Sequence, residues 1–391
     1  MVADPYPAWE RLREDDPVHW SESLGGWVLT RYADVRAALA DARLSADRIT
    51  PFLSRRGPTA TEAVEALLRR LGLWVVFTDP PIHTRLRGVL GRAFTGRAIE
   101  LRRSRVEGIV GWLLDRAAAA GEFDVIRDFA YPLPVAVIGD LLGIPPEDHE
   151  RLKAWSDELA IFVGSALTTP DKDERAARGV AELHEYFEHV VARRRAVPDD
   201  DLVTALLAAE QRDDGLSQAE LVASCVLLLF AGHETTTNLI GNSVLALLRN
   251  PAAARTWRED PALTTSAVEE LLRFDGPTAA MVRVAREDLP IDGRVVHRGD
   301  RLFLMINAAN RDPRQFQEPD RLDLRRADNR HLAFGHGIHF CLGAPLARLE
   351  GQVALPALLA RFSGLSPRGE GPEWLDSLVF RGMRSLPVAL G

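Results

Sequence analysis

One cysteine lies in a segment whose composition suits a metal-binding thiolate. Cys341 stands in the glycine-rich stretch 334–343 and just before 344–350, which reads as a helix with proline in its first turn. The free N–H groups and the dipole of a helix N-terminus favour a thiolate, and glycines let the backbone approach a flat ligand closely. A thiolate ligand to haem iron has these requirements. A buried structural cysteine and a zinc site that includes His336 and His339 remain as alternatives.

A second candidate site interrupts a long apolar stretch. A capping box at 217–220 starts a pattern that runs to Leu248, which predicts a helix on the order of 50 Å long. Its centre, AGHETTTN at 231–238, places a glycine, a carboxylate and three threonines directly after apolar side chains, where burial of a charge is costly. A polar face turned to solvent is one explanation. The other is that the glycine lets a ligand approach while Glu234 and Thr235 handle protons.

Helices dominate the elements that position these residues. Apolar side chains recur at helical spacing over 106–114 and 180–191. Strand patterns are fewer and lie at 27–30, at 289–296 with a turn at Asp292-Gly293, at 302–306, and at 377–388 with a turn at Gly382. We therefore expect a mainly α protein with small peripheral β-sheets. Residues 1–391 are expected to form a single domain with a helix-rich lobe and a smaller β-containing lobe.

Composition excludes several classes of protein. The chain has 391 residues and a net charge of −8, which argues against a nucleic-acid or anionic-membrane partner because both bind basic surfaces. Its two cysteines, Cys225 and Cys341, are too few for a disulfide framework or an all-cysteine cluster. The chain starts without a signal-peptide pattern, and its longest apolar run, 221–232, is shorter than the ~20 residues of a membrane span. We therefore expect a cytoplasmic location.

Four segments, in the expected order, resemble those of the cytochrome P-450 superfamily, of the soluble bacterial type, so the resemblance covers nearly the whole chain. FGHGIHFCLGAPLAR at 334–348 is similar to the haem-binding signature, which is long and specific. AGHETT at 231–236 resembles the oxygen-activating segment of the central helix. ELLR at 270–273 resembles a buried Glu/Arg pair, and 316–322 resembles the segment that supplies a second arginine. The resemblance implies the P-450 fold, with a long helix over a haem and the cysteine loop beneath.

The same resemblance implies a haem-thiolate monooxygenase that uses haem b and O₂ to hydroxylate a hydrophobic small molecule. Cys341 would bind the iron, and Thr235, with Glu234 behind it, would deliver protons through ordered water. Basic side chains would meet the two haem propionates, for which arginine is well suited. The residues implied to hold the haem are His83, Arg87, Ala231, Arg283, Phe334, Gly335, His339, Cys341 and Gly343.

Two further residue sets follow from the resemblance. Glu270, Arg273 and Arg321 would form a buried ion-pair network beneath the haem, although an i,i+3 pair taken alone is more typical of a surface. The substrate pocket would be lined by Phe162, Val163, Leu228, Ala279, Ala280, Met281, Val282 and Phe380. This apolar wall suits a terpenoid, a fatty acid, a steroid or a macrolide.

The electrons would come from other proteins, because the chain has no flavin or nicotinamide fingerprint. The resemblance implies a ferredoxin and an NAD(P)H-linked ferredoxin reductase. Two alternatives remain open: a family member diverted to oxidative coupling or peroxide-driven oxidation, and a haem-binding sensor that never turns over. The intact pair of Glu234 and Thr235 favours the monooxygenase, since relatives that use peroxide often depart from it.

Overall fold

The computed structural model describes residues 3–51, 61–165, 168–210 and 215–390. The helices are α1 (Tyr6–Asp15), α2 (Tyr32–Ala40), α4 (Glu62–Leu71), α5 (Ile82–Ala93), α6 (Gly96–Glu100), α7 (Arg103–Ala120), α8 (Pro132–Leu141), α9 (His149–Val163), α10 (Lys172–Ala196), α11 (Leu202–Glu210), α12 (Gln218–Arg249), α13 (Pro251–Glu259), α14 (Thr264–Asp275), α15 (Ile306–Ala309) and α16 (Ala344–Arg361), with short helical turns such as η2 (Val75–Phe77) and η6 (Gly337–His339). The strands are β1 (Val18–Ser21), β2 (Gly26–Leu29), β3 (Leu44–Ser45), β4 (Phe123–Asp124), β5 (Ala280–Ala285), β6 (Leu289–Ile291), β7 (Arg294–Val296), β8 (Arg301–Met305), β9 (Ser366–Pro367), β10 (Glu373–Trp374), β11 (Met383–Ser385) and β12 (Pro387–Ala389).

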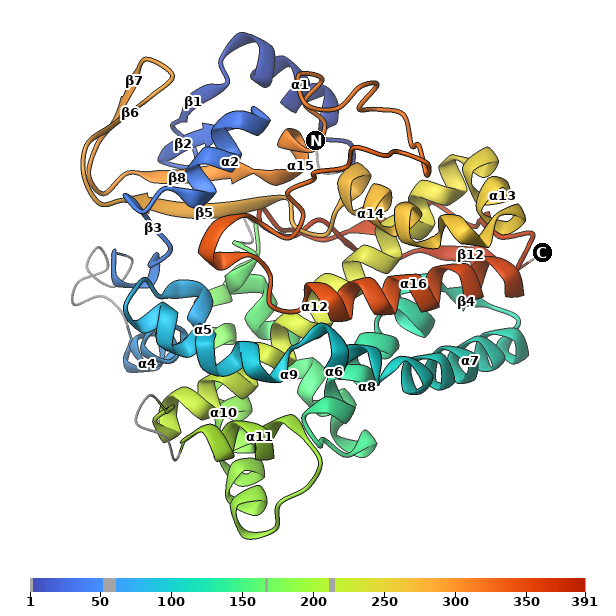
Figure 1. Ribbon diagram of the computed structural model, residues 1–391, viewed down its shortest axis with the longest axis horizontal. Coiled ribbons are helices and arrows are strands. Elements are labelled where there is room, and N and C mark those ends of the chain that lie inside the picture. Colours follow the sequence, from blue (N-terminus) through green and yellow to red (C-terminus); the bar gives the residue numbers. More distant parts are fainter. Residues whose placement is uncertain (1–2, 52–60, 166–167, 211–214, 391) are drawn as a thin grey trace.

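Sheets and helices occupy different parts of the molecule (Figure 1). The largest sheet has five strands in the order β1-β2-β8-β5-β3, and it lies with α1, α2 and α15 at one end. The longer helices fill the rest, and three small sheets of two or three strands complete the fold. The expected class, mainly α with small sheets, is confirmed.

The long helix α12 organises the helical part. The Ser217 side chain accepts from the Glu220 N–H (3.3 Å), and the Ser217 N–H donates to Glu220 Oε2 (2.8 Å), so the predicted capping box is confirmed. Arg85 binds the same carboxylate and ties α5 to this helix start. The helix has 32 residues, about 48 Å at ~1.5 Å per residue. It packs against α8, α10, α14 and α16, which places it at the centre of the main apolar core.

One of the two predicted hairpins is confirmed and the other is wrong. β6 pairs with β7 around Asp292 and Gly293, whose φ values of +47° and +72° are those of a tight hairpin turn. Gly382 makes no such turn: β11 pairs with β10, and β12 pairs with β4 and β9. A Cβ at Gly382 would collide with the side-chain amide of Asn238 in α12. This glycine is therefore explained by close packing against the central helix.

Within the described ranges, every helix is too short or too polar to cross a membrane.

Candidate active site

Cys341 lies in a tight loop that leads into α16. Gly335 and Gly337 have φ values of +74° and +75°, in the left-handed region that favours glycine. The Cys341 N–H donates to the Phe334 carbonyl (2.9 Å), which closes the loop. A Cβ on Gly335 would lie 3.3 Å from Cε of Met281, so the strand β5 packs closely against this loop. The loop therefore holds the thiol in one position relative to the sheet and the helix.

Donors surround the Cys341 sulfur. The backbone N–H groups of Gly343 and Ala344, at the start of α16, point at the thiol. Burial raises the pKa of the Cys341 thiol, and these two hydrogen bonds together with the charges of Arg87 and Arg348 oppose that rise. The exposed surface of Cys341 faces an internal cavity, which the residue helps to line. The helix N–H groups and the two arginines therefore offset part of the cost that burial imposes on a thiolate.

A cavity of about 250 Å³ lies between the Cys341 loop and α12. Most of its wall is apolar, including Leu90, Leu239 and Leu346. The predicted site residues that line it are His83, Arg87, Leu228, Ala231, Thr235, Met281, Phe334, His339, Cys341 and Gly343. The structure thus brings together residues from α5, α12, β5 and the cysteine loop that are up to 260 positions apart, 83 to 343.

Two histidines with unpaired ring nitrogens line this cavity, and the charge of Arg283, which is not part of the cavity wall, acts on one of them. The rings of His83 and His339 are 4.2 Å apart, and each has a buried Nε2 without a hydrogen-bond partner among the described residues. Burial, with the charges of Arg283 and His83 nearby, lowers the pKa of His339 to about 3. Arg283 is 7% exposed and donates to the carbonyl of its neighbour Val282, and burial lowers its pKa to about 10.

These groups fit the chemistry of a haem. Two carboxylates on a bound ligand would supply the acceptors that the imidazoles and Arg283 lack. The thiol offers a ligand for iron, and the apolar wall suits a porphyrin. Arg87 lines the cavity while one of its nitrogens donates to the Phe340 carbonyl (2.6 Å), which leaves its other N–H groups for a ligand.

Only part of the polar centre of α12 lines the cavity. Thr235 Oγ1 donates to the Ala231 carbonyl (3.0 Å), four residues back, and both residues line the cavity. Gly232 also lies at the cavity, but a Cβ there would approach the Ile138 side chain of α8 to 2.9 Å. Contact between α12 and α8 therefore explains this glycine, in addition to the ligand approach that the sequence suggested.

Glu234 lies one position from Thr235 but is not part of the cavity wall. Asn238 Nδ2 donates to its Oε1 (3.4 Å), and Asp157 and Lys153 of α9 act on its charge. Burial and the negative charge of Asp157 raise the pKa of Glu234 to about 7. This carboxyl can therefore gain or lose a proton near neutral pH.

A buried ion-pair network lies behind the cysteine loop. Glu270 and Arg273 of α14 are both 0% exposed, and two hydrogen bonds of 2.8 and 2.9 Å join them. Arg326 donates its Nε to Glu270 Oε2 (3.0 Å) and is 10% exposed. The N–H of Asp323 and the amide of Asn329 also donate to this carboxylate.

The prediction that Arg321 belongs to this network through its side chain is wrong. Arg321 is 63% exposed and pairs with Glu318 at the surface. Only its backbone carbonyl takes part, as an acceptor from Arg273 and Arg326. The chain makes turns after residues 318 and 323, and these bring the later arginine, Arg326, to Glu270.

The predicted substrate pocket is divided between two cavities. Leu228 and Met281 line the cavity at Cys341, whereas Phe162, Val163 and Val282 line a second cavity of about 400 Å³. Ala279, Ala280 and Phe380 line neither, so the prediction that these eight residues line one substrate pocket is wrong. The cause in β5 is strand alternation, because successive side chains of a strand point to opposite faces. Ala280 and Val282 pack with Phe303 and Met305, on the opposite face from Met281.

Two contacts that the sequence reasoning missed also support the loop. Glu269 accepts from Arg348 of α16 (2.7 and 2.8 Å) and from His331 (3.2 Å). These partners lower the pKa of Glu269 to about 2. Arg348 lies in the recognised motif, yet nothing in the sequence indicates its partner, which comes from a helix about 80 residues earlier in the chain.

A long helix over a cavity, with a cysteine loop on the other wall, is the architecture of haem-thiolate proteins. The family model "Cytochrome P450" matches residues 53–380. The chain belongs to the cytochrome P450 family.

Individual relatives match over nearly their whole lengths. The chain is 43% identical to a vitamin D(3) 25-hydroxylase of Pseudonocardia autotrophica, covering 99% of this chain and 94% of that protein. It is 40% identical to cytochrome P450 107B1 of Saccharopolyspora erythraea, covering 100% and 96%. Among solved structures, P450BioI in complex with an acyl carrier protein carrying hexadec-9Z-enoic acid has a TM-score of 0.92 at 36% identity, covering 100% of this chain and 98% of that one. The chain is therefore a cytochrome P450 monooxygenase, and the cofactor of its family is haem b.

Proposed function

We propose that this enzyme holds its haem iron through the Cys341 thiolate and uses O₂ to hydroxylate a hydrophobic small molecule. The position of Cys341 carries the proposal: its thiol lines the cavity that Thr235 also borders, and the N–H groups at the start of α16 point at the sulfur. Bound there, haem supplies the activation of O₂ from which one oxygen atom is inserted into a carbon–hydrogen bond.

His83, His339, Arg283 and Arg87 would hold the two propionates. The two imidazoles are neutral near pH 7, because burial lowers the pKa of each ring, so each can donate one hydrogen bond. Arg283 would add a charged donor from a site where it has no acidic partner in hydrogen-bond contact among the described residues. Satisfying several buried donors at once would make haem binding strong and fix its orientation.

Thr235 and Glu234 would move protons. The Thr235 hydroxyl donates to the Ala231 carbonyl, so its oxygen keeps lone pairs that can accept from water in the cavity. Glu234 adjoins it along the helix and faces the α9 side, where its pKa of about 7 suits reversible proton exchange. We propose that Glu234 takes protons from the α9 side and that Thr235 orders the water that carries them into the cavity.

A hydrophobic substrate is proposed from the walls of the two cavities, which are lined largely by aliphatic and aromatic side chains. The names of relatives, a vitamin D(3) 25-hydroxylase and a 6-deoxyerythronolide B hydroxylase, support the same class. We also propose that residues 1–391 form one haem domain with a helical and a β-containing lobe.

We also propose that the electrons come from a ferredoxin and an NAD(P)H-linked ferredoxin reductase, because the chain has no flavin or nicotinamide fingerprint of its own. A cytoplasmic location is proposed because Cys341, which is unpaired, must stay reduced to act as a ligand.

The proton role of Thr235 is tested by Thr235→Ala, with Thr237→Ala as the control on the same helix outside the cavity wall. Both variants should keep their haem. Only Thr235→Ala should consume NAD(P)H without forming a matching amount of product and release peroxide instead, measured as product formed per NAD(P)H oxidised. Equal coupling in the two variants would contradict the proposal.

A further inference from the structure

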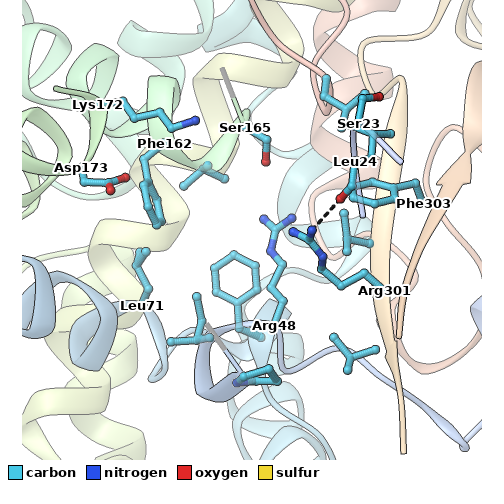
Figure 2. Close-up of a pocket in the computed structure, with 17 residues that line it drawn as sticks. Ser23, Leu24, Arg48, Leu71, Phe162, Ser165, Lys172, Asp173, Arg301 and Phe303 are labelled. Carbon is cyan, nitrogen blue, oxygen red and sulfur yellow. Dashed lines mark hydrogen bonds between the residues drawn. The ribbon is translucent and has the colours of Figure 1, made fainter. Parts of the chain in front are cut away.

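The second cavity, of about 400 Å³, contains an unusual charged group (Figure 2). It lies between the end of α9, the β5 and β8 strands, and the segment after β3. Its wall is largely apolar, with Leu71, Phe77, Val163 and Phe303 among the lining residues. Figure 2 shows the guanidinium group of Arg48 pointing into this space.

Arg48 has no acidic partner. Its guanidinium lies 4.6 Å from the centre of the Phe77 ring, and it makes no hydrogen bond or ion pair with a described residue. Burial, together with the positive charge of Arg283, lowers the pKa of Arg48 to about 10, and no carboxylate opposes this shift. Placing an unpaired cation against apolar side chains is costly. An anion bound in the cavity would remove that cost.

The other charged groups in the wall are already engaged. Arg301 donates to the carbonyls of Leu24 (2.5 Å) and Gly25, as the dashed line in Figure 2 shows for Leu24. Lys172 and Asp173 also have partners. Arg48 differs from these residues because its whole guanidinium group lacks a hydrogen-bonded or ion-paired partner among the described residues, and cations outnumber acidic groups in this wall.

This cavity adjoins the one at Cys341. Val76 and Met281 line the cavity at Cys341, whereas their immediate neighbours Phe77 and Val282 line the second cavity. The η2 turn and β5 thus border both cavities. A molecule with its charged end at Arg48 would have to pass the edge of these two segments to bring its apolar body to Cys341.

We propose that Arg48 is a specificity-determining residue that binds the carboxylate of the substrate, so that the preferred substrates are apolar molecules bearing one carboxylate. This inference rests on the proposed function, which it makes more specific. The guanidinium offers paired N–H donors for a carboxylate, and the apolar surroundings strengthen the charged hydrogen bonds. A neutral analogue would leave Arg48 unpaired.

The test uses the holoenzyme and two probes of equal chain length. Dodecanoate is titrated below its micelle concentration and 1-dodecanol below its solubility limit. Binding is followed by the shift of the Soret band as water leaves the iron. The parent should bind dodecanoate about tenfold or more tightly than the alcohol, since a charged hydrogen bond is worth at least that ratio. Arg48→Gln should lose this preference and bind the alcohol as the parent does. Arg43→Gln, at an exposed residue paired with Asp41 outside the cavity, should keep it.

Three results would overturn the proposal. The first is equal affinity of the parent for acid and alcohol, or no Soret shift with either probe. The second is a preference for the acid that persists in Arg48→Gln. The third is loss of haem from Arg48→Gln, which would place Arg48 at a haem propionate. The carbon monoxide spectrum of each reduced sample is recorded in parallel. A normal spectrum with a failed preference rejects only the role of Arg48, whereas an abnormal parent spectrum rejects the haem-thiolate site itself.

Discussion

Replacing Arg326 with alanine should destabilise the protein far more than the same change at Arg321. Arg326 is 10% exposed, donates to Glu270 Oε2 (3.0 Å) and also to the Gln317 carbonyl (2.8 Å). Arg321 is 63% exposed, and its partner Glu318 is equally exposed at 62%. The two arginines lie five positions apart in one loop, so they form a matched pair.

The expected magnitudes follow from burial. Loss of hydrogen bonds to a buried charge costs about 1.5–3 kcal/mol each, and Glu270 keeps Arg273 as a partner, so Arg326→Ala should cost about 2–3 kcal/mol. Arg321→Ala should cost no more than about 0.5 kcal/mol, because an exposed ion pair contributes little. Glu270→Ala leaves both buried arginines without their carboxylate and should be the most severe, at about 3–5 kcal/mol.

Urea unfolding of the three variants, followed by the fluorescence of the eight tryptophans, measures these costs, and the haem content of each purified variant reports on the cysteine loop. Equal losses of stability in Arg326→Ala and Arg321→Ala would refute the assignment of Arg326 to the network. A Glu270→Ala variant as stable as the parent would refute the importance of the network altogether.

Three further changes test other parts of the structure. Burial raises the pKa of Glu234 from 4.5 to about 7, so folding takes up a proton and stability falls as the pH rises between these values. Glu234→Gln should therefore recover up to about 3 kcal/mol at pH 8. If the plot of urea midpoint against pH is the same in this variant as in the parent, the expectation is contradicted. Burial also raises the pKa of Glu350 well above its usual range, so Glu350→Gln should unfold at higher urea than the parent at pH 8 but not at pH 5, and a lower midpoint at pH 8 would argue against a neutral buried acid. Gly335→Ala, at φ +74°, should lower the free energy of unfolding by about 1–2 kcal/mol and lower the haem content. Gly108→Ala in α7, where an added Cβ meets no neighbour, should lower neither. Equal haem contents in the two variants would contradict the role of the loop.

Local patterns in the sequence predicted the local parts of the site well. The capping box at 217–220 depends on residues three positions apart, and the hairpin turn at Asp292-Gly293 depends on two adjacent ones. The glycine-rich loop before α16 is likewise encoded in one continuous stretch, which is why the position of Cys341 followed from the sequence. In each case the residues that decide the geometry are neighbours in the chain.

Partners far apart in the chain were predicted less well. How the loop after α15 turns cannot be read from the sequence. Arg321 was therefore predicted as the partner of Glu270, whereas the fold places Arg326 there and leaves Arg321 at the surface. Gly382 reads as a turn residue, whereas its actual constraint is the approach of Asn238 from α12, more than 140 positions earlier. Contacts of this kind depend on packing between elements and leave no periodic signal.

The substrate pocket shows the same limit. A run of apolar residues such as 279–282 predicts a wall, but only the pairing of β5 with β8 decides which side chains face which cavity. Arg48 was missed for a related reason. Its environment is unusual because no acidic side chain reaches it, and that is a property of the folded protein alone.

The carbon monoxide difference spectrum of the reduced protein tests the central claim most directly, because it reports the ligand on the iron. The parent should give the absorption maximum from which the family takes its number. Cys225→Ser, which changes a buried cysteine that does not line the cavity, should give the same maximum. Cys341→Ser should lose that maximum. Retention of the maximum in Cys341→Ser, or its absence from the parent, would contradict the assignment of Cys341 as the thiolate ligand.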